Sequence, residues 1–133
     1  MGKNKLEKNT EVIAEIANAH QGSAETAFKL ALAFVNSGAD AIKFQIYFAD
    51  EMLNKDHQRY EHFKNQSFDH KTWDNLIQRL KKKKIKIYCD VFGVEAFKVA
   101  RKNNVDGYKI HSSDLNNIRL LNLIKKTKKK IFL

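Results

Sequence analysis

The sequence alternates four times between a short apolar segment and a helical segment, and this alternation restricts the fold more than any other feature. Strands that alternate with helices form parallel sheets with right-handed crossovers. The sequence therefore predicts an α/β fold whose strands lie in the order 1-2-3-4, with helices covering one face. The expected strands are Val12–Ala17, Ala41–Tyr47, Ile85–Val91 and Gly107–Ser112, and Ile131-Phe132-Leu133 resembles the opening of a fifth.

The helical segments carry recognisable start and stop signals. These signals are Ser23 and Gly38 around the first helix, Asp69 before the second, Asn103-Asn104 after Val94–Asn103, and Asn116 or Asn117 before the last. The long polar connection Phe48–His70 shows no clear periodicity, which predicts either short helices or a binding role.

Each expected strand has one face that becomes polar toward its carboxyl end. Alternate residues of a strand point to the same side, so Lys43 shares a face with Gln45, and Lys109 shares one with His111. By the same rule Tyr88 and Asp90 lie together. Cys89 falls in the opposite, helix-facing set and is predicted to be inert core.

Two lysines in the middle of parallel strands need a physical explanation. Burying an unpaired ammonium costs several kcal/mol, so Lys43 and Lys109 must face a cavity, a carboxylate or an anionic ligand. One interpretation is a set of buried ion pairs with nearby acids. We favour a ligand site, because carboxyl ends of parallel strands meet at one edge of a sheet or barrel. The carboxylates expected there are Glu15, Asp90 and Asp114.

Composition narrows the function classes. The 133 residues suffice for one domain, 1–133, and the net charge of +10 is attributed mainly to a solvated lysine-rich surface. No basic-aromatic interleaving indicates nucleic-acid binding. No apolar run approaches the ~18 residues of a membrane span. The single cysteine and the lack of a signal peptide favour the cytoplasm. The five histidines lack metal-ligand spacing, so no metal ligand is predicted.

Three segments resemble the sialic acid (N-acetylneuraminate) synthase family. They are E-I-A-N-A-H-Q-G at Glu15–Gly22, K-F-Q at Lys43–Gln45 and Y-K-I-H-S-S-D-L-N-N at Tyr108–Asn117. The family versions run close to E-I-G-x-N-H-N-G, K-F-Q and Y-K-I-A-S-G-E/D-L-T-N. The motifs occur in the family's order, and the resemblance covers Val12 to Leu133.

The resemblance implies the N-terminal half of a (β/α)8 TIM barrel. Family members condense phosphoenolpyruvate with an N-acetylated mannose-type sugar, giving a nine-carbon 2-keto acid and phosphate. The implied cofactor is a divalent metal, manganese or magnesium, whose ligands lie outside this sequence. The implied partners are phosphoenolpyruvate and an N-acetylated hexosamine, and a homo-oligomer is compatible with the pattern. Because the sequence stops in the fifth strand, we expect a truncated barrel without its antifreeze-like domain, inactive by itself.

Residue roles follow from the same resemblance. It assigns the carboxylate and phosphate of phosphoenolpyruvate to Lys43, Gln45, Lys109 and Ser112. Glu15 would hold the sugar, and Asp114 would handle protons at the attacking water. Asn18 and His20 belong to the matching turn as further substrate-binding candidates.

The sequence departs from the family at a few positions. Family members read S-T-P-F on the third strand, where this chain has Cys89-Asp90-Val91-Phe92. A carboxylate at Asp90 would repel a bound phosphate unless a lysine or the metal offsets it. Ala17 and Ser113 stand where glycine is usual, which reduces backbone room at both turns.

Two other functions remain open at this point. One is a different aldolase-like barrel enzyme that acts on a sugar phosphate or a keto acid. The other is a basic, non-catalytic interaction module, which a salt-dependent affinity for nucleic acid would favour. The long connection Phe48–His70 and the inward-facing lysines favour an enzyme over the module.

Overall fold

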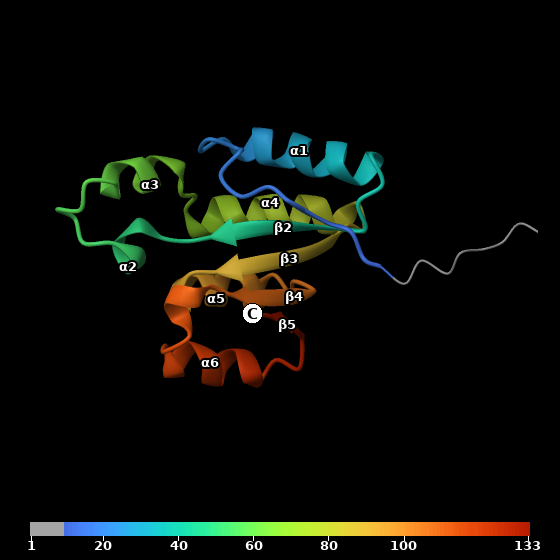
Figure 1. Cartoon of the computed structure of the whole chain (residues 1–133). Helices are drawn as coiled ribbons and strands as arrows, with labels where there is room; N and C mark the ends of the chain where they lie inside the picture. Colours follow the sequence, from blue (N-terminus) through green and yellow to red (C-terminus); the bar gives the residue numbers. More distant parts are fainter. Residues whose placement is uncertain (1–9) are drawn as a thin grey trace, which may run out of the picture.

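The computed structural model describes residues 10–133, whose strands form one parallel sheet in the order β1-β2-β3-β4-β5 (Figure 1). This order and the parallel pairing confirm the prediction. The first nine residues of the predicted domain lie outside the described residues. The strands are β1 (Ile13–Glu15), β2 (Ala41–Ile46), β3 (Lys86–Val91), β4 (Gly107–Ile110) and β5 (Lys130–Phe132).

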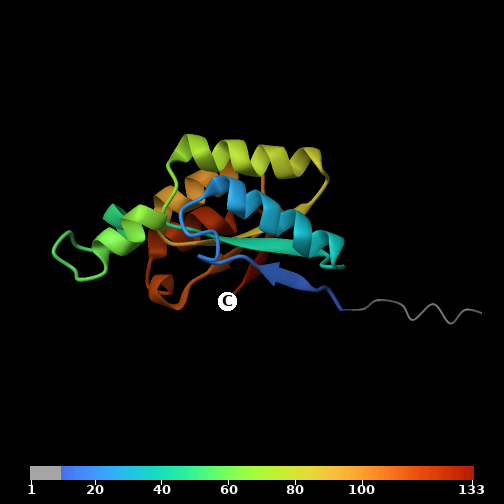
Figure 2. The same ribbon diagram turned by 90° about the horizontal axis from the view of Figure 1, so that it is seen from above.

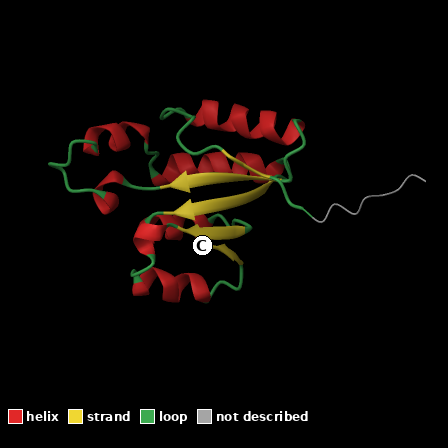
Figure 3. Cartoon of the chain, viewed as in Figure 1, coloured by secondary structure: helices red, strands yellow, loops and turns green. Residues whose placement is uncertain are grey.

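Helices follow the strands in turn, and Figure 3 shows the alternation. They are α1 (Ala24–Asn36), α2 (Ala49–Met52), α3 (Tyr60–Gln66), α4 (His70–Lys82), α5 (Gly93–Lys102), the 3-10 turn η1 (Ser112–Asp114) and α6 (Ile118–Lys125). The long connection thus contains two short helices, α2 and α3. No helix in residues 10–133 is long and apolar enough to cross a membrane.

The predicted caps form for local reasons. The Ser23 side chain accepts a hydrogen bond from the Thr26 N–H, and the Asp69 side chain accepts one from the Thr72 N–H. Asn117, rather than Asn116, caps α6. Each cap satisfies a backbone donor that the first helical turn leaves without a partner.

The hydrophobic core lies between the sheet and the helices on its outer face. Figures 1 and 2 both place α1 and α4 on the same side of the strands. Phe44 on β2 meets Trp73 on α4 in an edge-to-face ring contact, and both side chains are buried. Burial of each large side chain contributes about 1.5–3 kcal/mol. Cys89 lies in this layer as predicted, and its burial raises the pKa of the thiol.

Strand register decides which side chains lie beside one another on the inner face. Glu15 pairs with Lys43, and Lys43 pairs in turn with Tyr88. The next inner row begins at Gln45, which pairs with Asp90, and Asp90 pairs with Lys109. The polar residues predicted to share a face therefore form two adjoining rows across the sheet.

Candidate functional site

Glu15 is held at the end of β1 by two polar residues of β2. The Lys43 Nζ lies 3.2 Å from the Glu15 Oε2, and Lys43 is the more buried partner of this ion pair. The Gln45 Nε2 donates a hydrogen bond of 3.3 Å to the Glu15 Oε1. Both contacts arise because parallel register sets β1 and β2 side by side with their polar faces aligned.

Asp90 and Lys109 form a second ion pair, deeper in the sheet. The Lys109 Nζ lies 3.1 Å from the Asp90 Oδ2, and Asp90 is only 1% exposed. Within residues 10–133, the buried Asp90 Oδ1 has no hydrogen-bond partner. Burial raises the pKa of Asp90 above its ordinary value, against the opposing effect of Lys109.

Both lysines also face one cavity of about 280 Å³, which is lined by Ile13, Glu15, Lys43, Lys109, Phe132 and Leu133. The structure thus brings together three of the predicted site residues, Glu15, Lys43 and Lys109. The two interpretations from the sequence are compatible, since each lysine has a carboxylate partner and also borders open space. Two ammonium groups on neighbouring rows of one cavity wall are suited to an anionic ligand.

A second cavity, of about 530 Å³, lies at the carboxyl ends of the strands and includes Asn18, Gln45, Tyr47, Arg59, Phe92 and His111 in its wall. The Tyr47 hydroxyl donates to the Asn18 Oδ1 at 3.0 Å, and burial raises the pKa of Tyr47 to about 12. The His111 ring packs on Phe92 with 4.6 Å between centroids. Gln45 links the two cavities, because it lines this one and binds Glu15 in the other.

Tyr47 and Arg59 are not among the site residues predicted from the sequence. Tyr47 ends the second predicted strand, and its hydrophobic ring predicts a residue of the hydrophobic core rather than of a site. Arg59 lies in the connection between α2 and α3, and the length of that connection was the one signal of a binding role.

Asp114 lies away from the lysine cavity. Its Oδ2 accepts a hydrogen bond from the Gly93 N–H at 3.2 Å, and its Oδ1 accepts one from the Asn117 Nδ2 at 2.9 Å. It lines a third cavity, of about 230 Å³, with Glu51 and Gly93 among its neighbours. Ser112 lies in η1 and is exposed, and it lines none of these three cavities.

His20 has a buried position beside the turn. It is 1% exposed, its Nδ1 accepts a hydrogen bond from the Gly22 N–H at 3.1 Å, and its ring packs on Phe68. Burial lowers the pKa of His20, so the ring is neutral near pH 7. Ala17, in the same turn, has φ 45°, the left-handed conformation that glycine adopts most easily.

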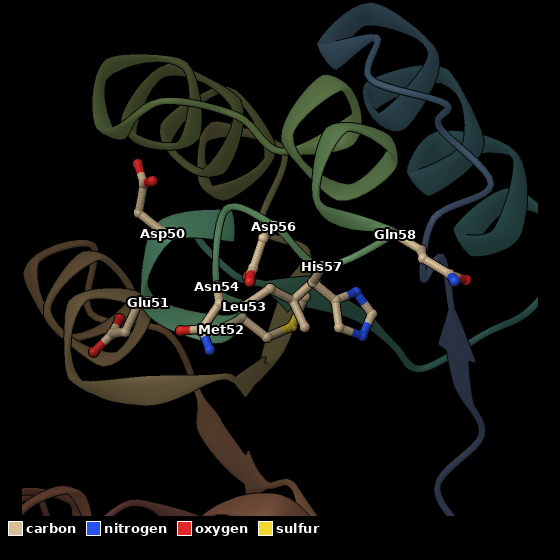
Figure 4. A pocket seen from close by; sticks show the side chains of 8 residues that line it. All are labelled: Asp50, Glu51, Met52, Leu53, Asn54, Asp56, His57 and Gln58. Carbon is tan, nitrogen blue, oxygen red and sulfur yellow. The ribbon is translucent and has the colours of Figure 1, made fainter.

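A larger open cavity, of about 680 Å³, is formed by α2 and the segment after it (Figure 4). Figure 4 shows Asp50 directed away from the centre of this group, and its carboxylate accepts a hydrogen bond from Tyr60. Glu51 is also engaged, because its Oε1 accepts from the Val94 N–H at 2.7 Å. No three His, Cys, Asp or Glu side chains in the described part of the chain are grouped to hold a metal ion.

The sequence matches a known protein family. The model of the NeuB family matches residues 30–133. A pseudaminic acid synthase of Campylobacter jejuni subsp. jejuni is 27% identical over 97% of this chain and 42% of its own length. An N,N'-diacetyllegionaminic acid synthase of Legionella pneumophila subsp. pneumophila is 36% identical over 52% of this chain and 19% of its own length.

Solved structures extend the comparison to the fold. The N-acetylneuraminic acid (sialic acid) synthetase of Leptospira borgpetersenii serovar Hardjo-bovis, crystallised with citrate, superposes with a TM-score of 0.81 at 28% identity. The match covers 92% of this chain and 44% of that protein. The chain therefore spans less than half the length of these relatives, and its five parallel strands correspond to part of a barrel, as the resemblance implied.

Proposed function

The chain belongs to the NeuB family, and we propose that it provides the phosphoenolpyruvate-binding part of a nonulosonic acid synthase. The proposed reaction condenses phosphoenolpyruvate with an N-acetylated mannose-type sugar, giving a 2-keto sugar acid and phosphate. Synthases of related sugar acids among the relatives support this class. The observation that carries the proposal is that Lys43 and Lys109 line one cavity. These two cations belong to the family-like motifs K-F-Q and Y-K-I.

In the proposed complex the two lysines hold the carboxylate and phosphate of phosphoenolpyruvate. A cation fixed beside each anionic group offsets charge that redistributes as bonds change, without reorganisation during the reaction. Gln45 is proposed as a neutral hydrogen-bonding group for the same substrate. Ser112 is proposed as a second one, a role that requires η1 to approach the ligand, because Ser112 is exposed and lines none of the three cavities. The carboxyl end of a parallel barrel is where enzymes of this architecture place their substrates.

The acceptor sugar is proposed to lie toward the second cavity. Glu15 and Asn18 offer oxygen acceptors for sugar hydroxyls, and the Gln45 amide lies between the two cavities. This places the sugar beside the proposed phosphoenolpyruvate position, which a condensation requires. We propose His20 as a support of this turn, because its ring is buried against Phe68.

Asp114 is proposed to exchange protons with the attacking water, and this role requires the water to reach the separate cavity that Asp114 lines. Both its oxygens accept hydrogen bonds, from Gly93 and Asn117, so this role requires one of these bonds to exchange for water. The divalent metal implied by the resemblance finds no ligand set among residues 10–133.

Isothermal titration of phosphoenolpyruvate into the 133-residue chain tests the anion site. Lys43→Met and Lys109→Met keep most of the side-chain volume and remove the charge. Each should weaken affinity tenfold or more, because a hydrogen bond to a charged group is worth ~1.5–3 kcal/mol. Lys29→Met, at an exposed position of α1, is the matched control and should bind as the wild type does.

Lys109→Met also removes the partner of a buried carboxylate. The double variant Lys109→Met/Asp90→Asn restores charge balance and keeps the test valid if the single variant fails to fold. Unchanged affinity in Lys43→Met relative to the wild type, and in the double variant relative to Asp90→Asn, would contradict the proposed site.

A further inference from the structure

We propose that Asp90 takes up a proton when an anion binds between Lys43 and Lys109, so that ligand binding at this site is coupled to protonation of a buried carboxyl. The inference rests on the anion site proposed above. It adds that the protonation state of Asp90 determines how tightly this site binds an anion. It follows from the contacts of Asp90 and from the charge balance around it.

The first observation is that the positive and negative charges of the site already balance. Its two cations, Lys43 and Lys109, are each paired with a carboxylate, Glu15 and Asp90. With all four groups ionised, their formal charges cancel. A multiply charged anion gains little from such a site unless one of the carboxylates is neutralised.

The second observation is that Asp90 depends on Lys109. Asp90 is 1% exposed, and the 3.1 Å contact with Lys109 engages only its Oδ2. Its Oδ1 is buried and, in the part of the chain that the structure describes, has no partner. Glu15, in contrast, is substantially exposed and can return to water when Lys43 turns to a ligand. The buried Asp90 carboxylate cannot be hydrated in this way.

An anion that engages the Lys109 ammonium therefore competes with Asp90 for it. If Lys109 turns to the ligand, an ionised Asp90 is left buried and unpaired, which is strongly unfavourable. The bound anion adds like-charge repulsion to this cost. A proton on Asp90 removes both penalties, and the resulting carboxylic acid gains an O–H donor. Asp90 then has the hydrogen-bonding capacity that the family's threonine has at this position.

The surroundings of Asp90 favour this protonation. The groups that face it are Lys43 and Gln45 on β2, Lys109 on β4 and His111 after β4, with Glu15 beyond Lys43 on β1. Lys109, Lys43 and His111 favour the ionised form, yet burial outweighs them and raises the pKa of Asp90. A ligand that engages the two lysines weakens the opposing effect and raises the pKa further.

Calorimetric titration of sulfate tests the coupling, because sulfate keeps two charges throughout the neutral range and releases no proton itself. Titrations at pH 6 and pH 8, in buffers of different ionisation enthalpy, give the number of protons taken up. We expect the wild type to take up as much as one proton per sulfate. Where Asp90 is ionised before binding, affinity should fall by up to tenfold per pH unit.

Asp90→Asn and Asp90→Thr should take up no proton at position 90 and bind sulfate more tightly than the wild type at pH 8. His111→Asn should retain the uptake, which separates Asp90 from the nearby histidine. Asp56→Asn, at an exposed position, is the matched control and should retain it as well.

Different results would contradict the proposed anion site and the proposed coupling to Asp90. Sulfate binding by the wild type without proton uptake, or with equal uptake by Asp90→Asn, would overturn the role of Asp90 and leave the anion site intact. If sulfate binds neither the wild type nor the Asp90 variants, or if Lys43→Met binds it unchanged, the anion site itself fails and the coupling with it.

Discussion

Glu11 and Lys130 are 119 residues apart in the sequence, and their side chains form an ion pair of 2.6 Å. The same carboxylate accepts hydrogen bonds from the Lys86 Nζ at 2.7 Å and from the Tyr88 hydroxyl at 2.9 Å. Lys86 and Lys130 are the first residues of β3 and β5. Glu11 therefore ties the segment before β1 to two further strands. Its partner Tyr88 pairs in register with Lys43, so these contacts border the row of side chains that includes Glu15 and Lys43.

Glu11→Gln tests this connection through pH. The lysines hold the pKa of Glu11 at about 2, against an ordinary value of 4.5. A lowered pKa in the folded state stabilises the protein above pH 4.5, and this contribution is lost as pH falls toward 2. Urea denaturation should show Glu11→Gln less stable than the wild type at pH 7, with the difference shrinking in acid. Equal loss at pH 7 and pH 2.5 would argue against the ion pairs as its cause.

Glu51→Ala should destabilise the amino-terminal turn of α5. The Glu51 carboxylate accepts hydrogen bonds from the N–H groups of Val94 and Glu95, so it acts as a cap supplied by a distant element. Loss of a helix cap costs about 0.5–2 kcal/mol. Glu61→Ala, at an exposed glutamate of α3, should stay within about 0.5 kcal/mol of the wild type in the same thermal or urea unfolding. A similar effect of both substitutions would count against the cap.

Gly93→Ala should cost more than Gly38→Ala. Both glycines have positive φ, 89° and 100°, where an alanine is strained by about 1–2 kcal/mol. A Cβ at Gly38 meets nothing within 4 Å, whereas one at Gly93 clashes with the Glu51 carboxylate. The free energy of unfolding should therefore drop further for Gly93→Ala, and Glu51→Ala in the same chain should relieve part of the excess. Equal losses at the two glycines would show that the carboxylate yields without cost.

His20 should make the fold sensitive to mild acid. Burial lowers the pKa of His20 below its ordinary 6.5, so the unfolded chain binds this proton more readily than the folded one. Stability should be full above pH 6.5 and fall as pH decreases below it. His20→Asn keeps an acceptor for the Gly22 N–H and should flatten the dependence between pH 7 and pH 5. His62→Asn, at an exposed position, should leave the slope unchanged.

Local patterns in the sequence determined the elements and their faces. Alternation along a strand placed Cys89 toward the helices and Lys43 with Gln45 on the inner face, as the structure confirms. The caps Ser23 and Asp69 were readable because a cap is formed by residues three positions apart. Periodicity and capping are properties of a few neighbouring residues, so one sequence contains them in full.

Tertiary structure alone decided which of the candidate residues meet. Parallel register paired Lys109 with Asp90 and Lys43 with Glu15, whereas loop packing moved Asp114 to the start of α5 and brought Arg59 to the second cavity. Glu11 meets Lys130 because the segment before β1, at one edge of the sheet, reaches the first residue of β5, at the other edge. These contacts join residues far apart in the chain, and their geometry depends on register and loop packing, which are set by the whole fold rather than by any local segment.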